Sequence, residues 1–587
     1  MFKLLKNVTK KEWLIVVICF ALIVGQVWLE LKMPDYMSEI TVLVQSEGSD
    51  IKDIIANGAY MLACALGSLV SAVITGYFIS NISAHFSMNV RKKLFTKVEN
   101  LAMQEVKHFS TSSLITRTTN DITQVQMLIS MGLQLIIKAP ITAIWAITKI
   151  LNKSVEWSIV TAVAVAVLLT TIIILMIIVM PKFKIVQRLT DKINGVTREN
   201  LTGIRVVRAF NAEKYQEDKF EDVNNKLTNQ QLFNQKAFAV LSPIMYLVMY
   251  FLTLAIYFIG AYLIKDAMMA DKLTIFGDMV VFSSYAMQVI MSFLMLAMIF
   301  MMFPRASVSA NRINEVLETK ISIEDGSITK DVTGEKGTVE FRNVSFKYPD
   351  AKEYLLKNIS FKAEKGQTVA FIGSTGSGKS TLINLIPRFY DATEGTVLVD
   401  GVDVKEYSQE FLHNKIGYVP QKAVMFDGTV NSNVAYGDNG KEEVTEEQIK
   451  KAVEVAQGKE FVEKMDDKYE THIASGGTNV SGGQKQRLAI ARAIARDPEI
   501  YIFDDSFSAL DYKTDAVLRK ALKKHTKDAT NIIVAQRIGT IMNADKIIVL
   551  DDGNCVGVGT HKELLKKCKV YKQIALSQLS KEELENA

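Results

Sequence analysis

The sequence predicts an all-α membrane domain of six long transmembrane helices extending into the cytoplasm, followed by an α/β domain with a phosphate-binding loop. Long apolar runs and every tryptophan lie in the first half of the chain. Strand-like and helical segments alternate after Gly337, which favours a mostly parallel sheet. Residues 373–380 form a glycine-rich stretch between a strand-like and a helix-like segment. A chain of 587 residues also exceeds one hydrophobic core, so several domains are expected.

The first half contains apolar runs long enough to cross a bilayer, which takes about 20 helical residues. The first run follows Lys3 and Lys6 but is long and lacks a small-residue cleavage site, so it predicts a retained membrane helix. Lys138 and Pro140 interrupt the third run, where Lys138 faces either a cavity or partner helix, or the interface. The predicted spans are residues 13–31, 56–79, 127–151, 158–180, 239–264 and 277–303.

The connections between these spans differ in length and charge. Residues 80–126 and 181–238 are long, polar and basic, whereas those near 34–53, 152–156 and 265–272 are shorter. The excess of lysine and arginine places both long loops and both termini in the cytoplasm. Residues 108–117 and 203–213 within these loops are either short docking helices or ordinary solvated turns.

Two groups of side chains are candidates for a substrate cavity in the membrane. Methionines recur at spacings of three and four in the last span and share one helix face, which suits varied apolar ligands or lipid contact. Gln26 and Glu30 lie one turn apart in the first span, where a buried acid could receive a cationic ligand, or the pair could meet water at the interface. The methionine candidates are Met287, Met291, Met295 and Met298.

Domain boundaries follow from the loss of apolar runs and from turn signals. We expect a transmembrane domain over residues 1–318, a linker over 319–336 and a nucleotide-binding domain over 337–587. The net charge of +5 is small for this length and gives no reason to expect a nucleic-acid partner. The cysteines, Cys19, Cys64, Cys555 and Cys568, show no paired spacing.

The phosphate-binding loop is the strongest motif. Its glycines let several backbone N–H groups point into one hollow, and the following helix adds its positive end. Lys379 would reach the β- and γ-phosphates, and the Ser380 hydroxyl would hold Mg²⁺. A glycine-rich turn that matches by chance is the alternative.

A second element ends in two acids. Apolar residues lead to Asp504, which would hold Mg²⁺ through water, and Asp505 would face the attacking water. Aspartate is one methylene shorter than glutamate and falls about 1 Å short of such a water, a misplacement that can cost about 10²-fold. Upstream of the loop, Tyr348 could stack on an adenine ring or simply pack.

A third motif opens a helix with the residues Ser481, Gly482, Gly483 and Gln484. Ser481 caps the helix, and the glycines let its N-terminus approach an anion. A chain with its own phosphate loop has no need of a second anion site. The simplest use is therefore to close over a nucleotide held by another subunit.

The order and spacing of these motifs, together with Gln421 and Asp511, resemble those of an ATP-binding cassette domain, and the whole chain resembles a half-size ABC exporter. The resemblance implies a P-loop ATPase that pairs with a second half-transporter chain in the lipid bilayer and closes head-to-tail over two ATP molecules. It implies Mg²⁺ contacts by Ser380, Gln421 and Asp504, adenine stacking by Tyr348, and a D-loop at Asp511. The phosphates would be bound by Gly373, Ser374, Thr375, Gly376, Ser377, Gly378, Lys379, Ser380 and Thr381.

Both catalytic positions depart from the family pattern. Asp505 stands where the family has glutamate, and Gln536 stands where it has a switch histidine. The chain thus resembles the degenerate-site subunit of a heterodimeric bacterial multidrug exporter, which would hydrolyse its own ATP slowly and lend an intact signature to its partner. The expected cargo is a lipophilic small molecule. Export of a peptide or lipid, an ATP-gated channel or regulatory subunit, and a homodimer are the alternatives.

Overall fold

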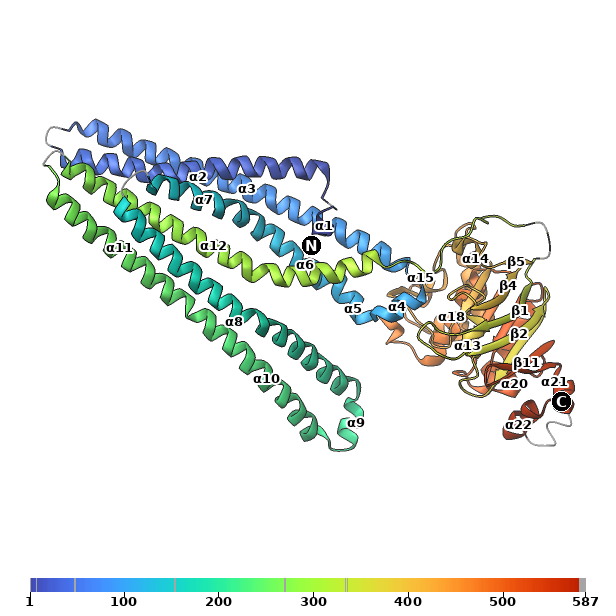
Figure 1. The fold of residues 1–587 in the computed structure, drawn as a ribbon. Helices are drawn as coiled ribbons and strands as arrows, with labels where there is room; N and C mark the ends of the chain where they lie inside the picture. The colour runs from blue at the N-terminus through green and yellow to red at the C-terminus, as the bar shows by residue number, and fades with distance from the viewer. Residues whose placement is uncertain are drawn as a thin grey trace. The chain divides into compact units, whose positions relative to one another are not determined.

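The computed structural model describes residues 2–6, 8–46, 49–151, 155–268, 271–332, 334 and 336–579. Within these residues the chain forms two compact units (Figure 1). The helical unit comprises Met1–Glu99 and Thr111–Thr319, and the α/β unit comprises Asn100–Ser110 and Lys320–Ala587. Several predicted segments lie partly outside the described residues. These are residues 47–48 of the loop predicted at 34–53, 152–154 of the connection predicted at 152–156, 269–270 of the loop predicted at 265–272, 333 and 335 of the predicted linker, and the last eight residues.

The helical unit is built from long helices with short connections. Among the described residues, six helical stretches are long and apolar enough to cross a membrane, as predicted. The helices are α1 (Phe2–Leu5), α2 (Lys10–Gln45), α3 (Ile51–Glu99), α5 (Thr111–Thr116), α6 (Ile122–Met127), α7 (Leu133–Leu151), α8 (Val155–Thr202), α9 (Ile204–Ala209), α10 (Glu213–Ala239), α11 (Leu241–Asp266) and α12 (Lys272–Glu318), with π-helical turns η1 (Arg117–Asp121) and η2 (Leu128–Gly132).

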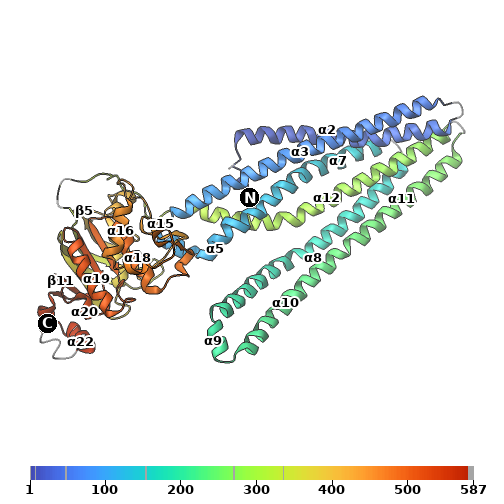
Figure 2. The same ribbon diagram turned by 180° about the vertical axis from the view of Figure 1, so that it is seen from behind.

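Most of these helices run well beyond the predicted spans. Helices α8 and α10 lie side by side and are joined by the short helix α9, which both views of the unit show (Figure 2). The predicted loop at 34–53 is wrong at its start, because α2 continues through Pro34 to Gln45. Proline removes one backbone hydrogen bond, but neighbouring helices make that loss tolerable inside a membrane helix.

The α/β unit contains the phosphate-binding loop and the sheets around it. One sheet has the strand order β2-β1-β4-β5, and the other has the order β12-β11-β3-β10-β9-β6. Strands β11, β3, β10, β9 and β6 are parallel, as the alternation of strands and helices predicts. Parallel neighbours end at the same edge of a sheet, so the loops after β3, β9 and β10 meet there.

The strands of the unit are β1 (Val339–Phe346), β2 (Leu356–Ala363), β3 (Thr368–Gly373), β4 (Glu394–Val399), β5 (Val402–Asp403), β6 (Ile416–Val419), β7 (Gly428–Thr429), β8 (His472–Ile473), β9 (Ile500–Asp504), β10 (Thr530–Val534), β11 (Lys546–Asp551) and β12 (Asn554–Gly559). Its helices are α4 (Met103–Phe109), α13 (Lys379–Ile383), α14 (Gln409–Asn414), α15 (Val430–Val434), α16 (Glu446–Val455), α17 (Lys459–Glu463), α18 (Gly482–Ala495), α19 (Tyr512–His525), α20 (Ile538–Ile541), α21 (His561–Lys567) and α22 (Lys569–Gln578), with 3₁₀ turns η3 (Lys468–Glu470) and η4 (Ser475–Gly477).

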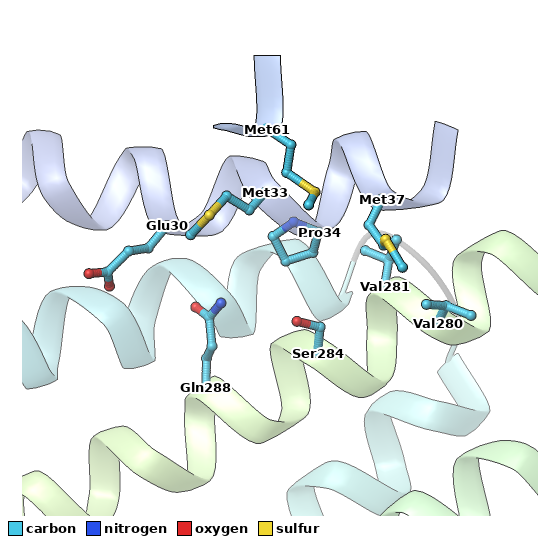
Figure 3. Close-up of a pocket in the computed structure, with 9 residues that line it drawn as sticks. All are labelled: Glu30, Met33, Pro34, Met37, Met61, Val280, Val281, Ser284 and Gln288. Atoms are coloured by element: carbon cyan, nitrogen blue, oxygen red, sulfur yellow. The ribbon is translucent and has the colours of Figure 1, made fainter. Parts of the chain in front are cut away.

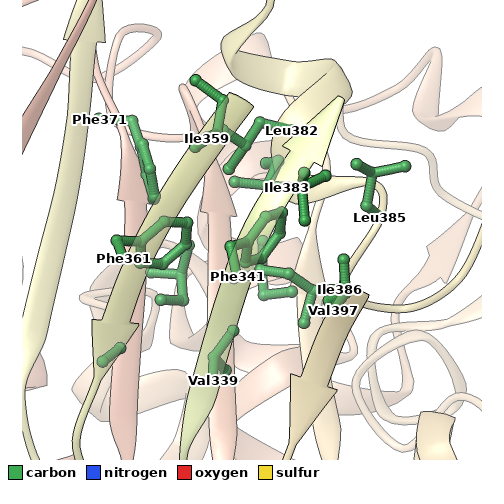
Figure 4. Packing of buried hydrophobic residues seen from close by; sticks show 14 of the residues in the cluster. Val339, Phe341, Ile359, Phe361, Phe371, Leu382, Ile383, Leu385, Ile386 and Val397 are labelled. Atoms are coloured by element: carbon green, nitrogen blue, oxygen red, sulfur yellow. The ribbon is translucent and has the colours of Figure 1, made fainter. Parts of the chain in front are cut away.

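An aromatic core joins the two sheets (Figure 4). The rings of Phe341 and Phe361 stack with centroids 4.6 Å apart, and Phe361 meets Phe371 of β3 edge-to-face at 5.2 Å. Leu382 and Ile383 of α13 are fully buried in the same cluster. The helix that follows the phosphate-binding loop is therefore fixed by its apolar side while the loop faces the sheet edge.

The stretch predicted as a linker runs along the α/β unit where it is described. The Gly326 N–H donates to the Tyr407 carbonyl, and the Ile328 N–H donates to the Glu406 carbonyl, each at 2.9 Å. Arg388 donates to the Glu324 carbonyl at 2.8 Å. These bonds order residues 324–328 as part of that unit.

Candidate nucleotide-binding site

The phosphate-binding loop turns between β3 and α13. Gly376 and Gly378 adopt φ values of +87° and +91°, a left-handed backbone that side chains disfavour. The Lys379 ammonium is buried at the centre of the loop and donates to the carbonyls of Gly373 and Ser374 at 3.0 and 2.7 Å. Burial lowers the pKa of Lys379, while the nearby Asp505 and Asp504 favour its charged form. The loop thus combines a buried cation with a tight glycine turn before α13, a combination that suits phosphates.

Asp504 ends strand β9 and faces the loop. Its Oδ1 accepts a hydrogen bond from the Ser380 hydroxyl at 2.8 Å. Burial raises the pKa of Asp504, and the neighbouring Asp505 raises it further. A hydroxyl and a buried carboxylate beside phosphate-binding N–H groups are oxygen donors of the kind that suits Mg²⁺.

Asp505 lies beside Asp504, and the structure brings it to Gln536. The Gln536 amide donates to the Asp505 carboxylate at 2.8 Å, and the Gln421 amide donates to the same oxygen at 3.4 Å. Asp505 has a φ of +47°, and burial raises the pKa of its carboxyl. The two positions that depart from the family pattern are therefore direct hydrogen-bond partners, which the sequence alone did not indicate.

Tyr348 is held from two sides. Its hydroxyl lies 3.0 Å from Thr381 Oγ1, directly after the phosphate-binding loop, and its ring meets Tyr390 edge-to-face at 5.4 Å. The Lys107 ammonium lies 5.0 Å from the centre of the Tyr348 ring and 5.4 Å from that of Tyr390. The Tyr390 hydroxyl raises the pKa of Lys107. These contacts hold the Tyr348 ring in place beside the loop.

Lys107 belongs to α4, which packs within the α/β unit although it lies between long helices in the sequence. Of the predicted docking stretch 108–117, the structure places only the residues up to Ser110 in that unit. The helix that contains His108 therefore begins earlier than the predicted stretch, at Met103. Sequence reasoning missed Lys107 and Tyr390 because neither lies in a motif, although a lysine near the predicted docking stretch was a signal.

The Ser481 motif forms the start of α18, with Ser481 as its N-cap. Ser481 caps the helix by accepting from the Gln484 N–H at 3.3 Å, and the Gln484 side chain accepts from the Ser481 N–H at 2.8 Å. Ser481 and Gly482 are exposed. Asp511 caps α19 by accepting from the Thr514 N–H at 2.9 Å. The exposed N-terminus of α18 can therefore meet an anion that another molecule holds.

Some of the candidate cavity residues of the helical unit line a cavity, and others do not. Gln26 is buried and donates to Glu30 at 2.8 Å, and Glu30 lines a cavity (Figure 3). Met291 and Met295 line a second cavity beside it, whereas Met287 and Met298 line neither. Met33 lines both cavities and was missed, because it lies next to the predicted end of the first span.

Comparison with known families agrees with this geometry. Residues 14–293 match the ABC transporter transmembrane region, and residues 356–508 match the ABC transporter family. An uncharacterized ABC transporter ATP-binding protein of Mycobacterium tuberculosis is 39% identical over 547 residues, covering 92% of this chain and 93% of the relative. The chain belongs to the ABC transporter family.

Two further relatives and one solved structure are also similar to the chain. YfiB of Bacillus subtilis, an uncharacterized ABC transporter ATP-binding protein, is 35% identical and covers 91% of each chain. An ATP-dependent lipid A-core flippase of Pseudomonas aeruginosa is 32% identical, covering 83% of this chain and 79% of the flippase. The fold matches a bacterial Atm1-family ABC exporter with ATP bound, with a TM-score of 0.80, 23% identity, and coverage of 98% of this chain and 99% of that one. The protein thus binds ATP and belongs to a family of ATP-hydrolysing transporters that span the bacterial membrane.

Proposed function

We propose that this exporter is the slow-hydrolysing half of a heterodimer, which grips ATP at its own site and completes the hydrolytic site of a partner chain. The observation that carries the proposal is the hydrogen bond from the Gln536 amide to the Asp505 carboxylate. A hydrolytic site needs a base that reaches the attacking water. Asp505 stands at that position, but its side chain is short and its carboxylate accepts hydrogen bonds from the Gln536 and Gln421 amides.

The chemistry of this pair disfavours rapid hydrolysis. A carboxylate about 1 Å too far from the attacking water can cost about 10²-fold in rate. The Gln536 amide neither gains nor loses a proton near neutral pH, so it lacks the adjustable charge that histidine offers a phosphate. Binding needs neither group, because Lys379 and the loop N–H groups supply the phosphate contacts.

We further propose that Mg²⁺ binds with ATP through Ser380, Gln421 and Asp504. The Ser380–Asp504 contact fits such an ion because both groups offer oxygen. Bound Mg²⁺ would neutralise phosphate charge. The residues of this chain orient the triphosphate and hold it in place.

The exposed start of α18 supports the dimeric part of the proposal. Ser481 and Gly482 are accessible and their helix N-terminus is intact, which is what the partner's ATP would require. ATP retained at the slow site would then bias the pair toward one conformation. The basic long loops favour an arrangement with both termini and the α/β unit in the cytoplasm of a bacterial cell.

The proposed cargo is a lipophilic compound or drug. Apolar helix surfaces and the methionines Met33, Met291 and Met295 around one cavity support this class. A lipid is the second candidate, which the similarity to a lipid A-core flippase favours.

The test uses the purified chain, reconstituted alone and with the second chain that co-purifies from its native membrane. Alone, we expect it to retain ATP and to release phosphate slowly. In the pair, replacing the partner's hydrolytic glutamate should abolish turnover, whereas Asp505→Ala should leave most of it. Rapid steady-state phosphate release by the lone chain, or equal loss from the two substitutions, would contradict the proposal.

A further inference from the structure

An ion pair lies among the membrane-spanning helices of the exporter. The Lys138 ammonium of α7 donates to the Glu30 carboxylate of α2 at 2.8 Å. The same Glu30 oxygen accepts from Gln26 at 2.8 Å and from Ser68 of α3 at 3.1 Å. Three helices thus meet at one carboxylate whose charge is balanced. This pairing argues against the expected cationic ligand, because Glu30 already has its cation.

Both charged groups line a cavity of about 390 Å³, together with Met33, Met291 and Met295. A second cavity of about 250 Å³ shares Glu30, Met33 and Gln288 with it, and Figure 3 shows Glu30 and Gln288 coming from facing helices. The charged pair therefore lies in a cavity whose remaining lining is both polar, from serine, threonine and glutamine side chains, and apolar, from the methionines and an alanine.

Two polar atoms at this cavity have no hydrogen-bond partner among the described residues. They are Oγ1 of Thr142, a residue that is 7% exposed, and Oε1 of Gln288. Buried polar atoms are almost always paired, so these two atoms are available to hydrogen-bond the polar atoms of a molecule that enters the cavity.

The charge balance selects among ligand classes. A cation that pairs with Glu30 leaves the Lys138 ammonium without a counter-charge among the membrane helices. An anion that pairs with Lys138 likewise leaves the Glu30 carboxylate without one. A head that carries both charges can exchange partner for partner, its cation to Glu30 and its anion to Lys138, with the sum of charge unchanged. The apolar remainder of such a molecule would contact the methionines.

We infer that this cavity takes the zwitterionic head of an amphiphile, bound between Glu30 and Lys138, as the cargo of the exporter. The inference rests on the proposed function, since it names the chemical class of the lipophilic cargo. A phospholipid head and a single-chain zwitterion share this chemistry, and the experiment includes both.

The experiment measures binding to the full-length chain without nucleotide, in nanodiscs of phosphatidylglycerol, whose head is anionic. The probes share a dodecyl chain: dodecyl betaine, dodecyltrimethylammonium and dodecyl sulfate, all below micelle formation. A short-chain phosphatidylcholine is the phospholipid arm. We expect at least one of the two zwitterions to bind about 10-fold or more tightly than the cation and the anion. The reason is that the singly charged probes each leave one protein charge unpaired, whereas a zwitterion pairs with both.

Substitutions should change the preference in opposite directions. Glu30→Gln leaves a lone ammonium and should favour the anion over the zwitterion, whereas Lys138→Gln should favour the cation. The charge-swapped variant E30K/K138E should retain the zwitterion preference. Asp35 and Lys149 form a second ion pair between α2 and α7, at 2.8 Å, that lines neither cavity. Asp35→Asn and Lys149→Gln are therefore matched controls, and the binding ratios should not change in them.

The outcomes separate this inference from the proposed function. Tightest binding by the cation or the anion overturns the inference and leaves lipophilic export standing, and failure of every probe to bind removes both. The same ratios in wild type, E30Q and K138Q also overturn it. Because nucleotide is absent, fast hydrolysis at Asp505 would contradict the slow-site proposal without touching this result. If a single substitution fails to fold, the wild-type ratios and the swapped variant still decide.

Discussion

Restoring a long acid and an imidazole together should restore hydrolysis at the exporter's own site, whereas either change alone should do little. Asp505 accepts from Gln536 at 2.8 Å, so the two side chains are in contact and their effects are not additive. Asp505→Glu adds one methylene and brings the carboxylate about 1 Å closer to a water at the γ-phosphate. Gln536→His supplies a group that can take or give a proton.

The magnitude follows from that distance. Correcting a misplacement of about 1 Å is worth about 10²-fold, or about 2.7 kcal/mol of the activation barrier. In the single variant Asp505→Glu, the Gln536 amide stays beside the new carboxylate, so we expect less than about 10-fold. The double variant should reach the full factor, with a coupling of about 1–2 kcal/mol between the two positions.

The assay is steady-state phosphate release from the reconstituted chain alone, and from the pair after the partner's own glutamate has been replaced. The matched control is Asp505→Asn with Gln536→His, which has the imidazole but lacks the base and should stay slow. A double variant no faster than wild type in both preparations would refute the reasoning, as would single variants whose effects simply multiply.

Three other perturbations give separate checks. Lys107→Met removes the cation over the Tyr348 ring and should weaken ATP binding about 2–5-fold in a fluorescent-nucleotide titration, with Lys107→Arg close to wild type. Lys415→Met leaves three carboxylates without their buried partner and should lower the free energy of unfolding by about 3–5 kcal/mol, as measured by thermal unfolding. Burial lowers the pKa of Lys415, but its hydrogen bonds to carboxylates outweigh burial and hold that pKa above its ordinary value. The ion pairs therefore stabilise the fold fully below about pH 10, and the difference in unfolding free energy between wild type and variant should shrink only at more alkaline pH. Removing Mg²⁺ with EDTA should weaken ATP retention by wild type, and Asp504→Asn should make retention nearly insensitive to EDTA.

Motif residues could be predicted from sequence because local chain geometry decides their environment. The strand before Gly373 and the helix after Gly378 follow from apolar runs on either side of glycines, and the structure has both. The membrane helices could be predicted from their apolar runs. Their ends could not, because Pro34 ends a helix in water but is tolerated inside α2.

The unpredicted features are contacts between residues far apart in the chain. Glu30 and Lys138 each looked costly in a membrane helix, and only the packing of α2 against α7 shows that they compensate each other. The sequence likewise shows Gln536 and Asp505 as two separate departures from the family pattern, and only the structure shows that the Gln536 amide donates to the Asp505 carboxylate. Periodicity describes one element at a time, so it carries no information on such pairs.

The Asp505–Gln536 contact also says why both positions differ together. A histidine next to a buried carboxylate would change the charge of the site as it titrates near neutral pH. An amide donates its hydrogen bond without titrating and adds no charge, so the carboxylate keeps both of its amide partners, Gln536 and Gln421. Such a pair suits hydrolysis poorly, because a fixed donor on the carboxylate competes with the water that a base must reach. In the proposed function this contact is the cause of slow turnover, and changing only one of the two residues does not remove it, whereas ATP retention depends on Lys379 and the loop.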